Sequence, residues 1–370
     1  MKIVYVTSSE IPSRAAHTVH VMKISEAFVK NGHTLSLIMP VKNSEHATSA
    51  EIFKFYNVAP VFKIIPFLFY KIKGYSIINP VRMVLLIKKE KPAIVVCRAI
   101  GVAIYATLLG VKVIYDAHNN PERFVGYRSY LLRRFYKSKN LIKLTVVTET
   151  LKQLFIKEGI AASKLYIVPN GTNEVTDHTK IDAIANSGKL NIGYTGHLYP
   201  GKGMEVIAKV APHLPEVLFH IVGGRDEDIK MWQDKMKLDN VIFHGFIQQH
   251  ALSSYLNSFD ICVLPNLKSV STMNNEDIGN ITCPLKMFEY MAHKKPMIAS
   301  DLPVLREVLN ETNAVLCNPE NPQEWVDAIK SLQENIDLRQ SLANNAYELF
   351  KANYTWQKRA QKLVDGINSI

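Results

Sequence analysis

The stretch of the sequence with the clearest potential for chemistry is residues 281–307, ITCPLKMFEYMAHKKPMIASDLPVLRE. Pro284 suits the first turn of a helix, where its missing N–H is not needed. From Leu285 onward apolar residues recur at helical spacing, and Glu289 falls on a different face. The start of such a helix favours an anion such as a diphosphate, and a nearby carboxylate can accept hydrogen bonds from sugar or ribose hydroxyls. Residues 281–307 are therefore the first candidate for a binding site.

The second candidate is a glycine-bearing loop, residues 193–203 (GYTGHLYPGKG), between an apolar strand pattern and a helix pattern. Gly196 and Gly201 would let a backbone come close to a phosphate, with His197 between them, and Lys202 would supply a compact positive charge. A surface turn with a solvated lysine explains the loop equally well. The GxxxxGK[ST] pattern of a Walker A loop is absent. Both interpretations stay open at this point.

Two further strand ends carry residues that could meet a ligand. Gly224 and Arg225 end one apolar run, which would place Arg225 at the carboxyl edge of a sheet. Phe246 and Ile247 end the next run, where they could contact a nucleotide base. A surface arginine and an ordinary strand-end turn are the alternatives, and these residues alone do not decide between them.

In the first half of the chain the candidate residues are histidines and an arginine. His118 follows the strand pattern VKVIYDA, where it could bond a substrate hydroxyl or simply cap the edge of the sheet. Arg14 lies in the loop after the first strand pattern, and His17 and His20 flank the start of the next helix. These residues mark a second place where a ligand could bind.

The composition is that of a folded protein with about two domains. The 370 residues are 47% hydrophobic and 21% charged. The four cysteines have no metal-ligand spacing and imply no disulfide framework, which suits a reducing cytoplasm. The N-terminal apolar run is too short for a secretory signal, and no run reaches the ~18 apolar residues of a spanning helix. We expect a cytoplasmic protein that is not integral to a membrane.

No protein nucleophile or metal-ligand set stands out. The sequence has no HExxH motif, no cysteine–histidine cluster and no Ser-His-Asp order, and Asp260 stands alone in the strand pattern FDICVLPN. We therefore expect neither a cofactor nor a metal ion.

Two sets of alternating strands and helices must position these residues. In the first half the strand patterns are KIVYVT, TLSLIMP, AIVVCR, VKVIYDA, LTVVTE and YIVPNG, and in the second LNIGYTG, LFHIVGG, VIFHGFI, FDICVLPN, PMIASD and AVLCNP. Short apolar strands separated by helices predict parallel sheets covered on both faces. Residues 172–189 are polar and predict a linker. The sequence thus predicts an α/β fold of two Rossmann-like, doubly wound domains facing a cleft, at residues 1–180 and 186–353.

The formal charge of +11 is concentrated in the first half. Residues 1–185 hold 26 Lys and Arg against 12 Asp and Glu, whereas residues 186–370 hold 18 against 21. Residues 61–98 and 128–143 interleave basic with bulky apolar side chains, which favours an interfacial segment on an anionic membrane. Amphipathic helices with an apolar core face are the alternative. No nucleic-acid motif accompanies the charge, so no nucleic-acid partner is expected.

Taken in order, these motifs resemble the family 4 glycosyltransferases of GT-B fold. The matched elements are the first loop and helix with Gly32-His33, DAH118, VPNG171, GYTGHLYPGKG203, VGG224, FHGFI247, SFDICVLP265 and PLKMFEYMAHKKPMIASDLPVLRE307. They run through nearly the whole chain, and the last two are the most diagnostic. The form of the last element is similar to a branch associated with bacterial surface polysaccharides.

The resemblance implies a retaining hexosyltransferase that moves a sugar from a nucleotide-sugar donor, a UDP-sugar by family frequency, to a lipid-linked or polysaccharide acceptor. The second domain would bind the donor and the first the acceptor, the latter at Arg14, His17 and His20. The helix 354–370, with Trp356, would pack back on the first domain. The enzyme would lie on the inner face of the cell membrane.

The resemblance also assigns roles to residues. Three would be catalytic: His118 would contact the donor sugar, Lys202 would neutralise the departing diphosphate, and Glu289 would hold the ribose hydroxyls. Phe246 and Ile247 would flank the base. Backbone N–H groups of the loop Cys283–Met287 would meet the sugar or phosphate, and the remaining donor-side residues would be Gly196, His197, Gly201, Gly224, Arg225, Leu285 and Lys286. The expected mechanism is a front-face displacement in which the leaving phosphate helps to deprotonate the acceptor.

The sequence departs from the family pattern at three places. Ile281 stands where the first of two paired glutamates is usual, and His197 replaces an arginine. Arg14-Ala15-Ala16 replaces a glycine pair. These changes leave two alternatives to a transferase, a non-catalytic nucleotide-sugar-binding protein and a nucleotide-sugar epimerase of the same architecture. The sequence names neither the sugar, the acceptor nor the linkage.

Overall fold

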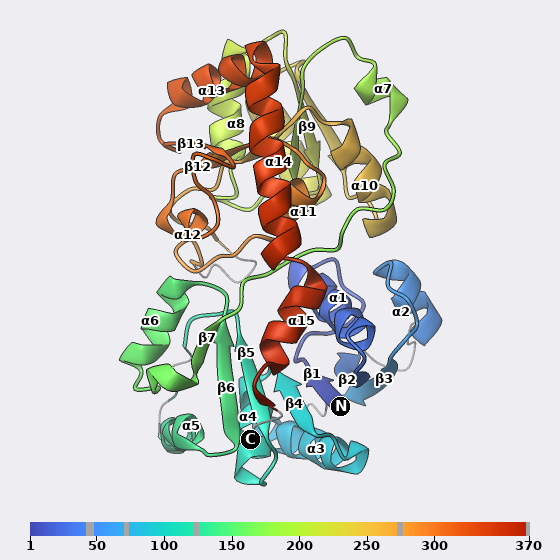
Figure 1. Ribbon diagram of the computed structural model, residues 1–370, viewed down its shortest axis with the longest axis vertical. Coiled ribbons are helices and arrows are strands. Elements are labelled where there is room, and N and C mark those ends of the chain that lie inside the picture. The colour runs from blue at the N-terminus through green and yellow to red at the C-terminus, as the bar shows by residue number, and fades with distance from the viewer. Residues whose placement is uncertain (42–47, 70–73, 122–123, 125, 272–276, 368–370) are drawn as a thin grey trace. The chain divides into compact units, whose positions relative to one another are not determined.

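The computed structural model describes residues 1–41, 48–69, 74–121, 124, 126–271 and 277–367. It divides into two compact units, the first formed by residues 1–169 with 356–370 and the second by residues 170–355 (Figure 1). Each unit holds one parallel sheet with helices connecting its strands. The expected α/β architecture of two Rossmann-like domains is therefore confirmed.

The first unit contains a seven-stranded sheet in the order β3-β2-β1-β4-β5-β6-β7. The strands are β1 (Lys2–Val6), β2 (Thr34–Val41), β3 (Lys63–Leu68), β4 (Ile94–Cys97), β5 (Val113–Ala117), β6 (Leu141–Val146) and β7 (Leu165–Ile167). The helices are α1 (Ala16–Lys30), α2 (Ser49–Phe55), α3 (Tyr75–Glu90), α4 (Ile100–Leu108), α5 (Tyr127–Lys137), α6 (Glu149–Lys157) and α15 (Trp356–Val364). Because β1 lies at the centre with β2 and β4 on its two sides, the strand order reverses there, and the loop after β1 opens at this reversal.

The second unit contains a six-stranded sheet in the order β10-β9-β8-β11-β12-β13. The strands are β8 (Asn191–Thr195), β9 (Leu218–Val222), β10 (Val241–Gly245), β11 (Ile261–Leu264), β12 (Met297–Ser300) and β13 (Val315–Cys317). The helices are α7 (Asp182–Ala185), α8 (Met204–Val210), α9 (Asp226–Met236), α10 (Gln249–Ser258), α11 (Leu285–Ala292), α12 (Pro303–Arg306), α13 (Pro322–Glu334) and α14 (Ile336–Asn353). Here β8 is the central strand at which the order reverses.

Successive side chains of a strand point to opposite faces of the sheet, so the central strand β11 contributes to two separate cores. Ile261 and Val263 pack with α8 and α13, whereas Cys262 and Leu264 pack with α11 and α14. Both faces of the sheet are therefore buried. This burial fixes the carboxyl end of β8 and the first turn of α11, which matter below.

The polar segment that we expected to be a linker belongs to the second unit. Residues 170–185 pack there, with Ile184 buried in the core beside α10 and α11. The N–H of Thr172 donates to the carbonyl of Tyr354 at 3.0 Å, which ties the two ends of the unit together. The boundaries fall at 169/170 and 355/356 rather than near residues 180–186 and 353–354, because a few apolar side chains anchor this mostly polar segment.

The basic stretch at residues 61–98 also differs from its expected form. It is neither one interfacial segment nor only amphipathic helix, since its first part is the edge strand β3. Pro66 is tolerated there because an edge strand has one unpaired side. Among the described residues, no helix combines the length and the apolar character that crossing a bilayer demands.

Candidate functional site

In the second unit, the residues predicted to bind a ligand gather around the carboxyl end of β8 and the first turn of α11. Tyr290 joins these two elements, because its hydroxyl accepts a hydrogen bond from the Thr195 N–H at 2.9 Å. Gly196 follows β8 directly, and a Cβ there would lie 3.9 Å from the Nζ of Lys286. The two stretches that the sequence singled out, residues 193–203 and 281–307, are therefore neighbours at this edge of the sheet.

Two lysine side chains come together at this edge: Lys202 is half-buried, and the Nζ of Lys286 is shielded from solvent. Burial lowers the pKa of Lys202 to about 8. Burial also lowers the pKa of Lys286 well below its usual range, and the charge of Lys202 lowers it further, while Glu289 acts in the opposite direction. An anion beside the two nitrogens would favour their charged forms, so this pair of lysines suits an anionic ligand.

The glycine loop is shaped by packing more than by free N–H groups. The Gly201 N–H donates to the carboxylate of Glu205 at 2.9 Å, and the Gly196 N–H to the carbonyl of Val222 at 2.9 Å. Gly201 has a φ of +79°, and a Cβ there would lie 1.9 Å from the carbonyl oxygen of Ser269. The expected backbone contacts from Gly196 and Gly201 to a phosphate are therefore not supported, since both N–H groups are already bonded.

Arg225 was expected to point toward the ligand, but it is engaged next to its own position. Its guanidinium forms two 2.8 Å hydrogen bonds to the carboxylate of Asp228 and lies over the ring of Tyr199. The hydrogen bonds to Asp228 raise the pKa of Arg225 above its usual range. Tyr199 also contacts His197, whose ring stacks on the Tyr199 ring with centroids 4.9 Å apart. Burial lowers the pKa of His197, so neither residue offers a ready cation in place of the usual arginine.

The residues around the start of α11 divide by role. Met287 is buried in the core and its N–H donates to the carbonyl of Pro284, so it does not offer an N–H to a ligand as expected. The carbonyl of Cys283 accepts from Asn170 at 2.7 Å. The N–H groups of Leu285 and Lys286 belong to the first helical turn, where no intrahelical acceptor exists.

The position of the missing glutamate is apolar in the structure as well as in the sequence. Ile281 is 3% exposed, and its N–H closes a turn on the carbonyl of Ile278. A carboxylate would be unfavourable in that environment. Glu289, by contrast, is half-buried on α11 and influences Lys286.

Gly224, Phe246 and Ile247 lie beyond the ends of β9 and β10. Gly224 packs on Leu198, since a Cβ there would lie 2.7 Å from that side chain. Phe246 is 38% exposed, whereas Ile247 is half-buried against the core around α11. Of the two residues expected to flank a base, Phe246 is the one with an accessible ring.

In the first unit, the candidate residues surround a buried ion pair at the end of β5. The guanidinium of Arg359 on α15 donates to both carboxylate oxygens of Asp116, at 2.9 and 3.0 Å. It also donates to the carbonyls of Val168 and Pro169. Figure 1 shows α15, in deep red, running beside α1. This network was missed from the sequence; the signal was an arginine on the apolar face of the last helix, one turn after Trp356.

His118 hydrogen-bonds to the Asp116 carboxylate through Nε2 at 3.0 Å. Burial and the nearby Arg98 lower the pKa of His118 to about 4, so the ring is neutral near pH 7. Burial alone would raise the pKa of Asp116, but Arg359 and His118 hold it well below its usual range. The Arg359 guanidinium also lies 3.2 Å from Nε2. The tautomer with the proton on Nε2 donates to the Asp116 carboxylate and leaves Nδ1 as a hydrogen-bond acceptor.

The three residues expected on the acceptor side occupy different environments. Arg14 and His17 are exposed near the start of α1. His20 is 2% exposed, with its ring 4.9 Å from the rings of both His118 and Trp356, so it lies behind the surface and not on it as expected. Burial and Arg98 lower the pKa of His20 well below its usual range.

His20, Asp116 and His118 have ligand atoms close enough to hold a metal ion. Arg359 is bonded to Asp116 and His20, and Arg98 is also bonded to His20. A cation at this cluster would therefore have to displace or oppose two guanidinium groups. The arrangement suits an internal polar network better than a metal site.

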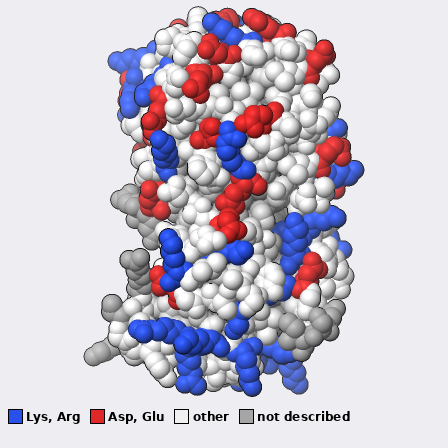
Figure 2. Space-filling view, turned by 60° about the vertical axis from the view of Figure 1, so that its left-hand side comes forward, with Lys and Arg blue, Asp and Glu red and all other residues white. Residues whose placement is uncertain are grey.

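The surface of the first unit is both basic and apolar. Figure 2 shows blue side chains crowded at the lower end of the view, with both colours mixed above. Arg128, Arg133, Arg134 and Lys137 are exposed on α5, next to the exposed rings of Tyr127 and Tyr130. The remaining face of α5 packs in the core, as the alternative predicted. Twelve of the fifteen large hydrophobic residues exposed in the described chain belong to the first unit.

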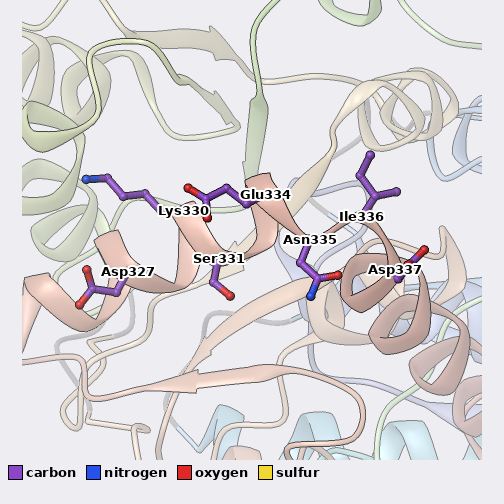
Figure 3. A pocket seen from close by; sticks show the side chains of 7 residues that line it. All are labelled: Asp327, Lys330, Ser331, Glu334, Asn335, Ile336 and Asp337. Atoms are coloured by element: carbon purple, nitrogen blue, oxygen red, sulfur yellow. The ribbon is translucent and has the colours of Figure 1, made fainter.

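A surface hollow at the junction of α13 and α14 contains none of the predicted residues (Figure 3). Its lining consists of Asp327, Lys330, Ser331, Glu334, Asn335, Ile336 and Asp337. Three carboxylates and one ammonium group do not favour a diphosphate there.

Two family models match the chain in succession. The one described as Glycosyltransferase Family 4 matches residues 17–175, and the one described as Glycosyl transferases group 1 matches residues 189–335. The chain is similar to an uncharacterized glycosyltransferase of Methanocaldococcus jannaschii, 23% identical over 60% of this chain and 58% of the relative. It is also similar to TuaH of Bacillus subtilis, a protein named for teichuronic acid biosynthesis, 27% identical over 52% of this chain and 51% of TuaH. The chain thus spans about half the length of the curated relatives that it matches.

Among solved structures, the fold is similar to that of HepE from Anabaena in complex with UDP and glucose. The TM-score is 0.73 with 16% sequence identity, and the match covers both chains entirely. At this identity the likeness establishes the fold.

Proposed function

Because this chain belongs to the family 4 glycosyltransferases of GT-B fold, we propose that it transfers a sugar from a nucleotide-sugar donor to a glycan acceptor with retention of configuration. A UDP-sugar is the proposed donor, in keeping with the UDP bound to HepE. A lipid-linked or polysaccharide acceptor of cell-surface glycan synthesis is proposed by analogy with TuaH. In this proposal the second unit binds the donor and the first unit the acceptor.

The observation that carries the proposal is the half-buried ammonium of Lys202 beside the first turn of α11. It lies at the carboxyl edge of a doubly wound sheet, where such folds bind nucleotides. A half-buried cation and the positive end of a helix together suit a diphosphate, which carries negative charge on several oxygens. A neutral ligand would gain little from a cation and the positive end of a helix dipole.

The proposed reaction needs no protein nucleophile. The bond from the anomeric carbon to the diphosphate oxygen breaks, and the acceptor oxygen forms its bond on the same face of the sugar. The departing phosphate oxygen takes the proton of the acceptor hydroxyl. Negative charge therefore grows on the diphosphate, and Lys202 would stabilise that charge in the transition state.

Two side chains would orient the donor. Glu289, on the helix that starts the site, would accept hydrogen bonds from ribose hydroxyls. The neutral His118 ring would accept a hydrogen bond from a sugar hydroxyl at Nδ1. The Asp116 carboxylate would favour the tautomer with the proton on Nε2. Neither role requires a change of protonation during the reaction.

We also propose that the first unit rests on an anionic membrane surface. The exposed basic residues of α5, with Tyr127 and Tyr130 beside them, combine charge with amphipathic rings of the kind that lie at a lipid interface. This would bring the enzyme to a lipid-linked acceptor at the cytoplasmic face of the cell membrane.

A panel of radiolabelled nucleotide sugars incubated with the protein and a membrane lipid extract tests the function. Label in the lipid fraction together with release of free UDP supports transfer. An isomerised donor without label in lipid would instead identify an epimerase. Binding of a nucleotide sugar with no turnover in any extract would identify a binding protein. The motivation for this alternative is Ile281, a buried apolar residue where the family pattern has a glutamate.

A further inference from the structure

The side-chain nitrogen of Lys286 is buried, and the described residues offer it no hydrogen-bond acceptor. It lies in the first turn of α11, and its stem is packed so that Nζ is shielded from solvent. The nearest group is the ring of Tyr194, whose centroid lies 3.7 Å from Nζ. A ring face attracts an ammonium group but cannot satisfy its three N–H donors. The Lys286 nitrogen can therefore donate hydrogen bonds to a bound ligand.

The neighbours of Lys286 show what it could bind. Lys202 adds a second positive charge, and the free N–H groups of the α11 first turn add the positive end of a dipole. Glu289 is the one carboxylate that acts on Lys286 in the described structure, and it forms no hydrogen bond to Nζ. The local field thus favours an anionic oxygen next to Nζ.

The alternatives within the second unit do not fill this role. Arg225 is already bonded to Asp228 by two hydrogen bonds, and His197 is uncharged through burial. Yet the departing diphosphate carries more charge than Lys202 alone would balance. The arginine that the family pattern has at position 197 is absent, and a cation is available from α11.

We propose that the ammonium of Lys286 is the second cation of the donor site and binds an anionic oxygen of the donor, in place of the arginine that is missing at position 197. The anionic oxygen belongs to the diphosphate or to the carboxylate of an acidic sugar such as a uronic acid. This inference rests on the proposed function, since it assumes a nucleotide-sugar donor.

The test compares the affinities of wild type, Lys286→Met and Lys286→Arg for uridine, UDP, UDP-glucose and UDP-glucuronate, measured by isothermal titration calorimetry. Lys209→Met serves as the matched control, because Lys209 is an exposed lysine of the neighbouring α8. A lost charge-assisted hydrogen bond predicts a roughly 10- to 100-fold weaker binding of the anionic ligand by Lys286→Met. Lys286→Arg should retain most of the affinity, and uridine binding should not change.

The arms separate the two sources of the anion. Weaker binding of UDP itself assigns Lys286 to the diphosphate, whereas weaker binding of UDP-glucuronate alone assigns it to a sugar carboxylate. Equal affinities of wild type and Lys286→Met for all four ligands would overturn the inference. Failure of the wild type to bind any of the nucleotides overturns the proposed donor site instead. If Lys286→Met does not unfold cooperatively, Lys286→Gln replaces it and the same comparison decides.

Discussion

Buried charge is arranged differently in the two units. In the first, the guanidinium of Arg359 lies 2.9 Å from the carboxylate of Asp116, and further hydrogen bonds tie the pair to Thr145 and to the Pro169 carbonyl of the same unit. In the second, the side-chain nitrogens of Lys202 and Lys286 lie near each other, and that of Lys286 is buried with no acceptor among the described residues. A charge that is satisfied internally serves the fold, whereas a buried charge without a partner points to a ligand. The predictions below test this contrast.

The largest effect is expected from breaking the ion pair of the first unit. Arg359→Met leaves Asp116 buried without its main partner, which costs about 3–5 kcal/mol of unfolding free energy. Urea denaturation followed by circular dichroism measures this loss. Lys358→Met, on the exposed face of the same helix, should change stability by no more than about 0.5 kcal/mol. Equal stability of both variants would show that the pair is not what holds α15 to the first unit.

A large effect on turnover is expected in the second unit. Lys202→Ala should lower kcat by roughly 10²- to 10³-fold, the range found when one stabilising group of a developing negative charge is removed. The folded protein should be no less stable, because a half-buried cation has been removed and not a partner of one. The assay follows UDP release with the most active donor and acceptor. A variant with wild-type turnover would show that Lys202 does not meet the diphosphate.

The surfaces of the two units are expected to differ in membrane binding. Arg133→Gln with Arg134→Gln should weaken binding of the protein to vesicles with phosphatidylserine by about 2 kcal/mol, since each basic residue near an anionic surface contributes about 1 kcal/mol. Lys330→Gln with Lys351→Gln removes the same charge from exposed helices of the second unit and should have little effect. Vesicle co-sedimentation at rising salt concentrations measures both. Binding to neutral vesicles with equal affinity would contradict an electrostatic surface.

The architecture and the location of the donor site could be predicted from the sequence, because both depend on local signals. Apolar runs mark parallel strands, and glycine or proline marks the loops after β8 and before α11. The Arg359–Asp116 pair joins residues 243 positions apart, and no local pattern records such a partner. The domain boundary was misplaced for the same reason, since Ile184 is a single apolar residue in a polar segment whose core neighbours lie far along the chain. Arg225 looked available in the sequence although Asp228 lies only three positions later, because their contact depends on the geometry of the turn before α9.

Alkaline pH should raise the stability of the ligand-free protein but weaken its binding of UDP. The pKa of Lys202 is about 8 in the folded protein and lower than in the unfolded chain, so the unfolded chain binds more protons above pH 8. Without ligand, stability should therefore rise with pH through this window rather than fall.

UDP binding requires the ammonium and should weaken above pH 8, by up to about tenfold per pH unit. The other titratable groups of the site are Lys286, Glu289 and His197. Calorimetric titrations at pH 7, 8 and 9 measure the effect, and Lys202→Arg should bind UDP with a flatter pH dependence because a guanidinium stays charged. An equally steep pH dependence in Lys202→Arg would move the responsible proton away from Lys202.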